Sequence, residues 1–306
     1  MVLTGPNGVS HDPAATDELD VSVVIVNYKV RDLLRDCLQS LGHALQSLRG
    51  EVWVVDNDSG DGSNEMVAAE FPWVRLIPST WNRGYGAANN LAIRQARGRH
   101  VLILNPDTKL PPNALIDTLA VMDADPTIGA LGPKLVRADG TLDRACRRSF
   151  PSPEVAFYRL FGLAKLFPNN PRFARYNLLH VDEDTAIDVD SVCGAFMLIR
   201  REAIERVGMF DEAFRMYGED LDWAYRIKAA GWRVRYHPAV VVLHYKGQSS
   251  RQRPVSSIRA FYDAMRRFYD KHYAEQHSAP FNAMIHAGIR AYEAAVLVRN
   301  RLKPHV

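Results

Sequence analysis

Short apolar runs alternate with segments of helical spacing over the first 125 residues, and this alternation constrains the fold more than any other feature of the sequence. Runs of β-branched and aliphatic residues, typical of buried strands, occupy residues 21–27, 51–56, 74–78 and 100–105. Apolar residues three or four positions apart predict helices over residues 33–48, 66–71, 84–98 and 111–125. The alternation predicts βαβ units, and therefore an α/β fold with a mostly parallel sheet that helices cover on both faces.

The remainder of the chain follows a less regular pattern. It predicts strands over residues 128–136, 188–200 and 232–236, and helices over residues 218–230 and, in two stretches, 256–301. Residues 140–187 contain many Pro, Asn and Arg and predict an excursion with short helices. We therefore divide the chain into a flexible N-terminal tail, an α/β domain and basic amphipathic C-terminal helices, at residues 1–20, 21–250 and 251–306.

The charge balance argues against a nucleic-acid-binding protein. The chain carries 38 Lys or Arg and 35 Asp or Glu, a formal net charge of only +3, whereas dedicated nucleic-acid binders are usually more basic. The bases gather at the end of the chain, where residues 251–306 hold ten Lys or Arg and four Asp or Glu. This last segment is therefore the part of the chain best suited to an anionic surface.

The cysteines and the N-terminus predict a cytoplasmic protein. Cys37, Cys146 and Cys193 are scattered and form no CxxC pair, which fits a reducing compartment. No basic segment followed by an apolar one opens the chain, so we expect no signal peptide. The sequence has no uninterrupted run of about 20 apolar residues, the length that a membrane-spanning helix needs.

Polar residues follow the first two predicted strands directly. Ligands of such sheets bind beyond the carboxyl ends of the strands, which directs attention to Asn27-Tyr28 and Asp56-Asn57. Asp56 can accept hydrogen bonds from a nucleobase or a ribose hydroxyl. Taken alone, the run DNDSGDG is more simply explained as a turn, because Asp and Asn stabilise turns well.

The third polar strand end is Asn105-Pro106-Asp107, after the most apolar strand. A carboxylate here can hold a divalent cation that bridges a diphosphate. Mg²⁺ keeps several waters and uses one or two carboxylates with phosphate oxygens, so Asp107 alone is chemically sufficient. The alternative is again a turn, which Asn-Pro and Pro-Asp both favour.

Two carboxylates without a local partner open the helix predicted over residues 218–230. Asp222 can pair with Arg226 four residues later, but Glu219 and Asp220 have no such partner. A carboxylate near a cleft can act as a general base on a hydroxyl. The simpler alternative is helix capping, because acidic residues in a first turn interact favourably with the helix dipole.

Several other motifs carry less information. His244 follows an apolar run, where a single His is more often structural than a ligand. The segment from Gly84 to Asn89 matches GxGxxG only loosely and does not follow the first strand, as a dinucleotide-binding fingerprint should. The sequence contains no GxxxxGK[ST], HExxH or GxSxG motif.

The order of the segments is more specific than any one of them. Along the chain they read VSVVIVNY, VVDNDSGDGS, NRGYGAANN, LILNPDT, CGAFMLIRR, FDEAFRMYGEDLDWAYRIKAAGW and LHYKGQS. Over residues 21–250 this series resembles the family 2 glycosyltransferases, which have the GT-A fold. Within the family it most resembles the bacterial rhamnosyltransferase-like branch, whose members build cell-envelope polysaccharides.

The resemblance implies a nucleotide site at the first strand ends. In the family the acid that ends the second strand recognises the nucleoside, which here is Asp56, followed by Asn57. Asn27 and Tyr28 then lie beside the nucleotide, and the segment from Asn82 through Gly84 to Asn89 packs near the base and ribose.

The resemblance also implies a metal site and a base. Asn105-Pro106-Asp107 stands where the family has a DxD-like element, so Asp107 is the main ligand of Mg²⁺ or Mn²⁺. His244, two dozen residues after Asp220, matches a His that completes the metal shell in some members. Glu219-Asp220 corresponds to the family's ED pair, with Asp220 as the base.

Two further positions follow from the resemblance. Cys193-Gly194-Ala195 matches the segment that lines the acceptor pocket, and Arg148 stands where relatives often carry an Arg near the donor diphosphate. The implied activity is inverting transfer of a sugar from a nucleoside-diphosphate sugar, dTDP-L-rhamnose first and UDP-sugars second. The implied acceptor is a hydroxyl of a glycan or of a polyprenyl-diphosphate-linked sugar.

Two other functions remain open. A sugar-nucleotide pyrophosphorylase is also Rossmann-like and uses Mg²⁺, but it places a Gly-rich, Arg-containing loop after the first strand, where this chain reads NYKVRDLL. The other is a non-catalytic protein that keeps the fold and binds carbohydrate or lipid. The sequence leaves the oligomeric state open.

The basic C-terminal segment also has two interpretations. The first is a helical bundle packed on the domain. The second is a helix on an anionic membrane surface, which would place the protein peripherally on the inner face of the cell membrane. Its apolar stripe and flanking bases would be Met284, Ile285, Ile289, Tyr292, Val296 and Leu297, with Arg290, Arg299, Arg301 and Lys303.

Overall fold

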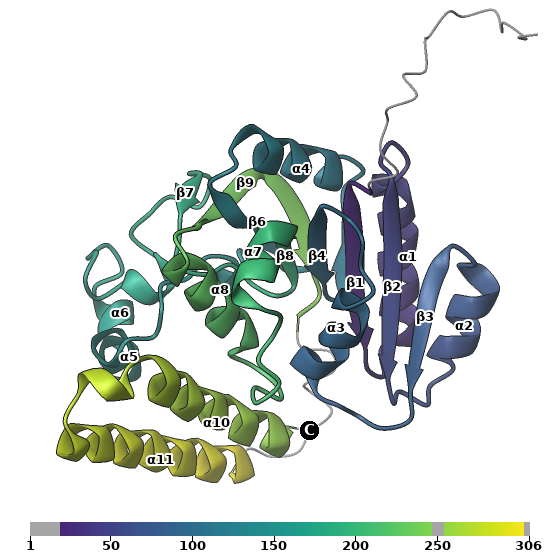
Figure 1. The fold of residues 1–306 in the computed structure, drawn as a ribbon. Coiled ribbons are helices and arrows are strands. Elements are labelled where there is room, and N and C mark those ends of the chain that lie inside the picture. The colour runs from purple at the N-terminus through teal and green to yellow at the C-terminus, as the bar shows by residue number, and fades with distance from the viewer. Residues whose placement is uncertain (1–18, 247–253, 303–306) are drawn as a thin grey trace, which may run out of the picture.

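Among residues 19–246 and 254–302, which the computed structural model describes, nine strands form a single sheet (Figure 1). These are β1 (Val21–Asn27), β2 (Gly50–Asn57), β3 (Val74–Ser79), β4 (His100–Leu104), β5 (Thr108–Lys109), β6 (Ile128–Val136), β7 (Ile187–Asp188), β8 (Phe196–Arg200) and β9 (Arg233–His244). Their order is β3-β2-β1-β4-β8-β6-β9-β5, and β7 pairs with β9.

Helices cover the sheet and extend beyond it. They are α1 (Arg31–Ala44), α2 (Ser63–Glu70), α3 (Tyr85–Ile93), α4 (Ala114–Ala124), α5 (Pro153–Leu160), α6 (Leu163–Leu166), α7 (Arg201–Val207), α8 (Glu219–Ala229), α10 (Pro254–His272) and α11 (Ala279–Arg301). Single 3₁₀ turns lie at Arg144–Cys146, Arg175–Asn177 and Ala274–Gln276.

The first half of the chain folds as the sequence predicts. Strands β3, β2, β1 and β4 are adjacent and parallel. Every residue of β1 and β4 is buried, which explains why these strands are apolar without alternation. The predicted α/β class is therefore confirmed.

The second half departs from a purely parallel sheet. Strand β8 lies antiparallel between β4 and β6, whereas β6 and β9 are parallel to each other. The strand predicted over residues 188–200 divides into β7 and β8. The residues between β7 and β8 pair with other segments. Val189 N donates to Val234 O, and Ser191 forms an isolated bridge with Arg148.

Strand β9 extends to His244, well beyond the predicted end at residue 236. The ladder pairs Pro133 with His237 and Lys134 with Val241, so residues 238–240 form a bulge. The bulge accommodates Pro238, which has no N–H to donate to a ladder. The sequence pattern missed this extension, and it also missed α7 and β5.

The C-terminal helices form a hairpin that packs on the domain. In Figure 1, α10 and α11 lie side by side below α5 and α8. Phe268 and Ala264 of α10 are buried against Phe214 and Leu221 of the domain. The bundle interpretation of this segment therefore holds for α10.

The predicted apolar stripe of α11 is divided between two environments. Ile289 is buried, and Ile285 and Val296 are half-buried, whereas Met284 and Tyr292 are exposed. Within the described parts of the chain, no helix combines the length and hydrophobicity needed to cross a bilayer. Residues 1–18 of the predicted tail, residues 247–253 and Lys303 lie outside the described residues.

Asp222 connects α8 to α10 and generates a stability prediction. It is fully buried and lies 2.8 Å from His272 Nε2, 2.8 Å from Lys271 Nζ and 2.9 Å from Arg226 Nε. We expect Asp222→Ala to lower the free energy of unfolding by about 3 kcal/mol, because Lys271, Arg226 and the ring of His272 lose a buried partner. Urea denaturation at pH 7 measures this, and Glu65→Ala on α2 is the control, with an expected change below about 0.5 kcal/mol.

The same carboxylate predicts a pH dependence. Burial opposes its charge, but His272, Lys271 and Arg226 lower the pKa of Asp222 to about 2. A carboxyl whose pKa is depressed in the folded state stabilises the fold above its ordinary value of 3.8 and loses this effect as the pH falls. The wild type and Asp222→Ala should therefore converge in stability between about pH 5 and pH 2. A difference that persists unchanged at pH 2 would contradict this ion-pair cluster.

Candidate active site

The strand ends singled out by the sequence meet at one edge of the sheet. In the register of β1 with β2, Asn27 lies opposite Asp56, and β4 runs parallel to β1 on its other side. Asn105 follows β4 directly, so its polar side chain emerges at the same edge. The fold thus brings Asn27, Asp56 and Asn105 together, as expected for parallel strands.

Asp56 is buried in a network of hydrogen bonds. It accepts from Asn27 Nδ2 at 2.9 Å, from Ser59 N at 3.2 Å and from Asn64 Nδ2 at 3.3 Å. The turn that the sequence offered as an alternative is therefore present. Asn27 keeps a buried Oδ1 without a partner among the described residues, and Tyr28 follows it, half-buried.

Asn57 organises the loop that enters α3. Its Oδ1 accepts from Arg83 N at 2.8 Å, and its Nδ2 lies 3.4 Å from Asn82 Oδ1 and from Gly84 O. Gly84 has a φ of 85°, and a Cβ there would lie 2.6 Å from Arg215 O. Only glycine fits this approach.

Asn89 is a predicted nucleotide residue that the fold does not bring to this edge. It is fully buried within α3, where its Nδ2 donates to Tyr85 O at 2.9 Å. It presents no exposed atom to a ligand in this arrangement. The sequence pattern could not separate a buried helical Asn from a binding one, because both follow the same glycines.

Asp107 and His244, the two predicted metal ligands, lie next to each other. Both are buried, and His244 Nε2 lies 3.4 Å from Asp107 Oδ1. Neighbouring ligands of an octahedral Mg²⁺, each about 2.1 Å from the ion, lie about 3 Å apart, so one ion can contact both. The described residues include no cluster of three or more His, Cys, Asp or Glu ligands. Water and phosphate oxygens would complete the shell, as is usual for Mg²⁺.

Asp143 lies behind this pair and was not predicted. Its Oδ2 is 3.0 Å from His244 Nδ1, and its other oxygen accepts from Lys246 Nζ. Burial alone would lower the pKa of His244, but Asp107 and Asp143 raise it to about 9. Carboxylates that favour a positive charge at this point favour a bound cation for the same reason. An Asp on the second nitrogen also fixes the orientation of a metal-binding His.

Glu219 and Asp220 begin α8 after a tight turn. Tyr217 and Gly218 have φ values of 68° and 78°, both in the left-handed region. For Tyr217 this conformation is strained, and strained backbone is often found at functional sites. The turn directs the first carboxylates of α8 towards the segment that carries Gly194.

Asp220 is held by a buried ion pair. Its Oδ2 accepts from Arg148 Nη2 at 2.6 Å and from Gly194 N at 3.1 Å, while its Oδ1 accepts from Leu221 N at 2.8 Å. Both members of the pair are about nine-tenths buried. The guanidinium of Arg148 is thus engaged with Asp220, so it holds the expected base rather than standing free near a diphosphate.

Glu219 is buried beside Asp220. Burial and the neighbouring charge of Asp220 raise its pKa well above the ordinary value. Its Oε2 is buried and has no partner among the described residues. Two adjacent carboxylates in one buried site repel each other, and the guanidinium of Arg148 bonds to Asp220 rather than to Glu219.

Tyr85 joins the sheet edge that carries Asn105 to the segment that carries Gly194. Its hydroxyl lies 2.9 Å from Asn105 Oδ1 and 3.1 Å from Gly194 O. Ala195 O accepts from Asn105 N at 3.0 Å, and the thiol of Cys193 stays neutral because burial raises its pKa to about 12. Hydrogen bonds therefore connect Asp220, through Gly194 and Tyr85, to the loop that carries Asp107.

This arrangement defines a class of protein. The model of the family described as "Glycosyl transferase family 2" matches residues 22–208, more than half of the chain. The chain belongs to this family and is a glycosyltransferase. The family resemblance seen in the sequence is confirmed, and the pyrophosphorylase alternative loses its support.

Among characterised proteins the chain is similar to two glycosyltransferases in particular. It is 30% identical over 295 residues to the N-acetylglucosaminyl-diphospho-decaprenol L-rhamnosyltransferase of Mycobacterium tuberculosis, a match that covers 92% of this chain and 94% of that protein. It is 24% identical over 253 residues to the low-salt glycan biosynthesis hexosyltransferase Agl10 of Haloferax volcanii, covering 81% of this chain and 74% of that protein.

Solved structures confirm the GT-A fold. A mannosyltransferase from Pyrobaculum calidifontis, solved with GDP-Man and Mn²⁺, superposes with a TM-score of 0.57 at 22% identity and covers 99% of this chain and 80% of its own. TarS 1–349 of S. aureus, solved with UDP, gives 0.55 at 18% identity and covers 89% of this chain and 70% of its own. At this level of identity the similarity shows the fold alone.

The Asp143–His244 contact predicts an effect on metal affinity. We expect Asp143→Asn to weaken Mn²⁺ binding about 10- to 100-fold, because His244 loses the charged group that orients it. Calorimetric titration of Mn²⁺ in the presence of dTDP measures the affinity. Asp139→Asn is the matched control, since Asp139 lies in the same loop and bonds only to Thr141 in this region. Equal affinities for the two variants would show that Asp143 does not support a metal ligand.

Proposed function

We propose that the chain is an inverting glycosyltransferase that moves L-rhamnose from dTDP-L-rhamnose, or second a sugar from a UDP-sugar, to a hydroxyl of a lipid-linked or polysaccharide acceptor in cell-envelope synthesis. The observation that carries the mechanism is the position of Asp220 at the start of α8, fixed by Arg148 and by Gly194 N. The near full-length similarity to an L-rhamnosyltransferase that acts on a diphospho-decaprenol-linked sugar supports the donor and the acceptor.

Asp220 acts as the general base. Its Oδ2 is occupied by two donors, whereas among the described residues Oδ1 accepts only from Leu221 N and retains a lone pair for the acceptor hydroxyl. As the acceptor oxygen attacks the anomeric carbon, its proton passes to Asp220, and the bond from that carbon to the diphosphate breaks. A single displacement from the opposite face inverts the anomeric centre.

Glu219 and Arg148 flank the base and keep it in position. A second charge next to Asp220 would repel the first, and this repulsion together with burial raises the pKa of Glu219. Arg148 stabilises that carboxylate, and its bond to Val192 O at 2.9 Å ties it to the acceptor segment. Positioning of this kind supplies much of the rate enhancement.

The donor binds at the opposite end of the hydrogen-bond network from Asp220, beside the loop that carries Asp107. Asp107 and His244 would hold Mg²⁺ or Mn²⁺, which supplies Lewis-acid neutralisation of the diphosphate leaving group. Asp56 recognises the nucleoside with Asn27 and Tyr28 beside it, and Asn57, Asn82 and Gly84 shape the base and ribose pocket. Cys193, Gly194 and Ala195 line the acceptor side.

The proposal predicts a selective loss of the chemical step. We expect Asp220→Asn to reduce transfer about 10²- to 10⁴-fold with little change in donor affinity, because the base is removed and the nucleotide contacts remain. A radiolabelled-sugar transfer assay measures the rate, and calorimetry with dTDP and Mn²⁺ measures binding. Glu70→Gln, which breaks an exposed ion pair with Arg35 of α1, is the control. Unaltered transfer by Asp220→Asn would exclude Asp220 as the base.

The donor assignment predicts a ranking of nucleotides. With Mn²⁺ present, dTDP should raise the Tm more than UDP or GDP, because a ligand at 100 times its Kd stabilises the native state by about 2.7 kcal/mol. A shift of about 5 °C is expected for a chain of this size. A thermal-shift panel at equal concentrations checks the ranking. A larger shift with UDP would overturn the rhamnosyl donor, and no shift with any nucleoside diphosphate would overturn the proposal as a whole.

A further inference from the structure

Four large apolar side chains stand exposed on one lobe of the molecule, far along the chain from the basic C-terminus. They belong to α5, α6 and the residues that follow each helix. Their exposed fractions are 50% for Phe157, 67% for Phe161, 69% for Leu166 and 50% for Phe167. We refer to these four residues as the apolar edge.

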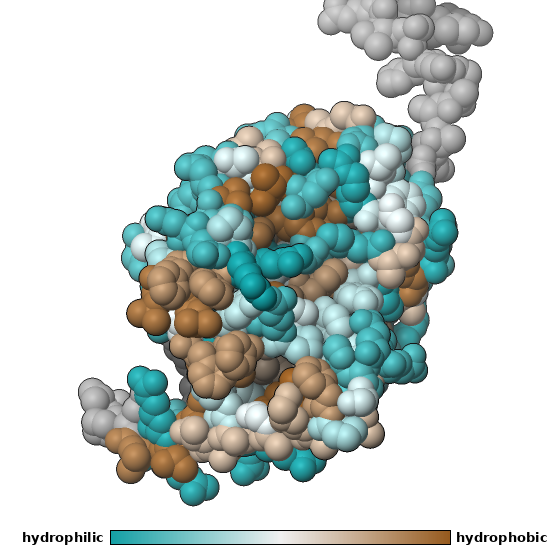
Figure 2. Space-filling view, turned by 90° about the vertical axis from the view of Figure 1, so that its left-hand side faces the viewer, coloured by the Kyte–Doolittle hydropathy of each residue, from teal (hydrophilic) through white to brown (hydrophobic). Residues whose placement is uncertain are grey.

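The apolar edge belongs to one continuous cluster of rings. The ring centroids of Phe157 and Phe161 are 4.4 Å apart, those of Phe167 and Phe173 are 5.5 Å apart, and Tyr158 lies between the two pairs. Figure 2 views the side of the molecule on which α5 and α6 lie, and hydrophobic residues gather on that face. An exposed apolar patch of this kind marks an interaction surface.

The lobe that carries the apolar edge, residues 151–180, is also basic. Residues 151–180 contain one acid, Glu154, and four bases, Arg159, Lys165, Arg172 and Arg175. Aromatic and aliphatic side chains next to Lys and Arg are the composition of segments that lie in the interface of an anionic bilayer.

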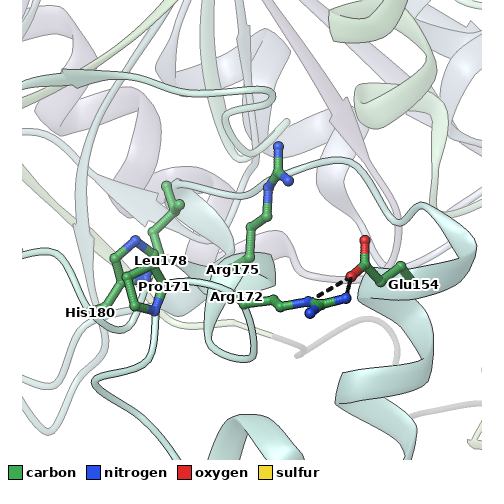
Figure 3. Close-up of a pocket in the computed structure, with 6 residues that line it drawn as sticks. All are labelled: Glu154, Pro171, Arg172, Arg175, Leu178 and His180. Carbon is green, nitrogen blue, oxygen red and sulfur yellow. Dashed lines mark hydrogen bonds and ion pairs between the residues drawn. The ribbon is translucent and has the colours of Figure 1, made fainter.

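A cavity at the foot of α5 adds a place for an anion. It has a volume of about 530 Å³, and its lining includes Glu154, Arg172, Arg175 and His180 (Figure 3). Arg172 is bonded to Glu154 at 2.8 Å, whereas Arg175 pairs with no carboxylate in the part of the chain that the structure describes. Arg175 is therefore a cation available to a phosphate at the rim of the apolar edge.

The lobe is directly joined to the proposed base. Arg148 holds Asp220, and α5 begins at Pro153, where Ser152 caps it through Val155 N. Five residues span at most about 18 Å, so the start of α5 lies within this distance of Arg148. A surface that binds this lobe would lie close to the acceptor side of the site.

We propose that the apolar edge inserts into an anionic lipid bilayer, with Arg172 and Arg175 at the level of the lipid phosphates, and that this orients Asp220 towards a membrane-borne acceptor. The inference deepens the proposed function, since it rests on an acceptor that is linked to a lipid. The membrane contact would then be made by α5 and α6 rather than by α11. On α11 the central Ile289 is already used in packing on the hairpin.

Sedimentation with vesicles tests the proposal without donor or acceptor. The probes are vesicles of phosphatidylcholine alone and of phosphatidylcholine with phosphatidylglycerol. We expect the wild type to bind the anionic vesicles, and F161S/L166S to bind them at least about tenfold more weakly, because two apolar side chains no longer enter the lipid. R172Q/R175Q should lose affinity for the anionic vesicles only.

The matched control is M284S/V298S on α11, which removes two side chains of similar exposure, 58% and 55%. It should bind as the wild type does. All these positions are exposed, so the variants should keep the Tm of the wild type within about 1 °C. F157S/F167S is a second pair on the apolar edge with the same expected loss. The proposal would be overturned if the wild type did not bind anionic vesicles, or if M284S/V298S and F161S/L166S lost vesicle affinity equally.

The two proposals can fail separately. Asp220→Asn should bind vesicles normally, because Asp220 is not part of the lobe's surface. If the wild type binds anionic vesicles through the apolar edge but transfers no sugar to any acceptor, the catalytic proposal alone fails. If it transfers sugar while F161S/L166S sediments as the wild type does, the membrane inference alone fails.

Discussion

The buried ion pair between Arg148 and Asp220 is the interaction on which the rest of the site depends. Removing two charges from water is costly, and the cost is recovered only when geometry and further hydrogen bonds are favourable. Here Gly194 N, Leu221 N and Val192 O supply those bonds. The pair therefore fixes the start of α8 against the segment before β8, and with it the direction from which an acceptor can approach.

The fold sets the distance between Asp220 and the Asp107–His244 pair through shared loops. Tyr85, at the start of α3, bonds to Asn105 on one side and to Gly194 on the other. The long strand β9, with its bulge, carries His244 to Asp107, and Asp143 holds the imidazole from behind. Asp107 and Asp143 flank His244 and favour a positive charge beside it, whereas Arg148 pairs with the carboxylate of Asp220 at the other side of the site.

Local pattern predicted much of this architecture. The apolar runs identified β1 to β4, and parallel pairing then required Asn27, Asp56 and Asn105 to share an edge. Contacts that depend on distant packing could not be predicted. Nothing in the sequence around Asp143 distinguishes it from the other acids of its loop, and the ion pair of Asp220 joins elements separated by the whole excursion of α5 and α6. The strand beyond Pro238 was missed because a proline ordinarily ends a ladder, which a bulge here avoids.

The central claim is that Asp56, Asp107 and Asp220 serve one donor and one acceptor. A crystal structure of the chain with dTDP and Mn²⁺ tests it most directly. The account predicts thymine near Asp56, the ion bound by Asp107 and His244, and Asp220 facing the open end of the diphosphate. A nucleotide bound away from the ends of β1, β2 and β4, or an ion that Asp107 does not contact, would contradict it.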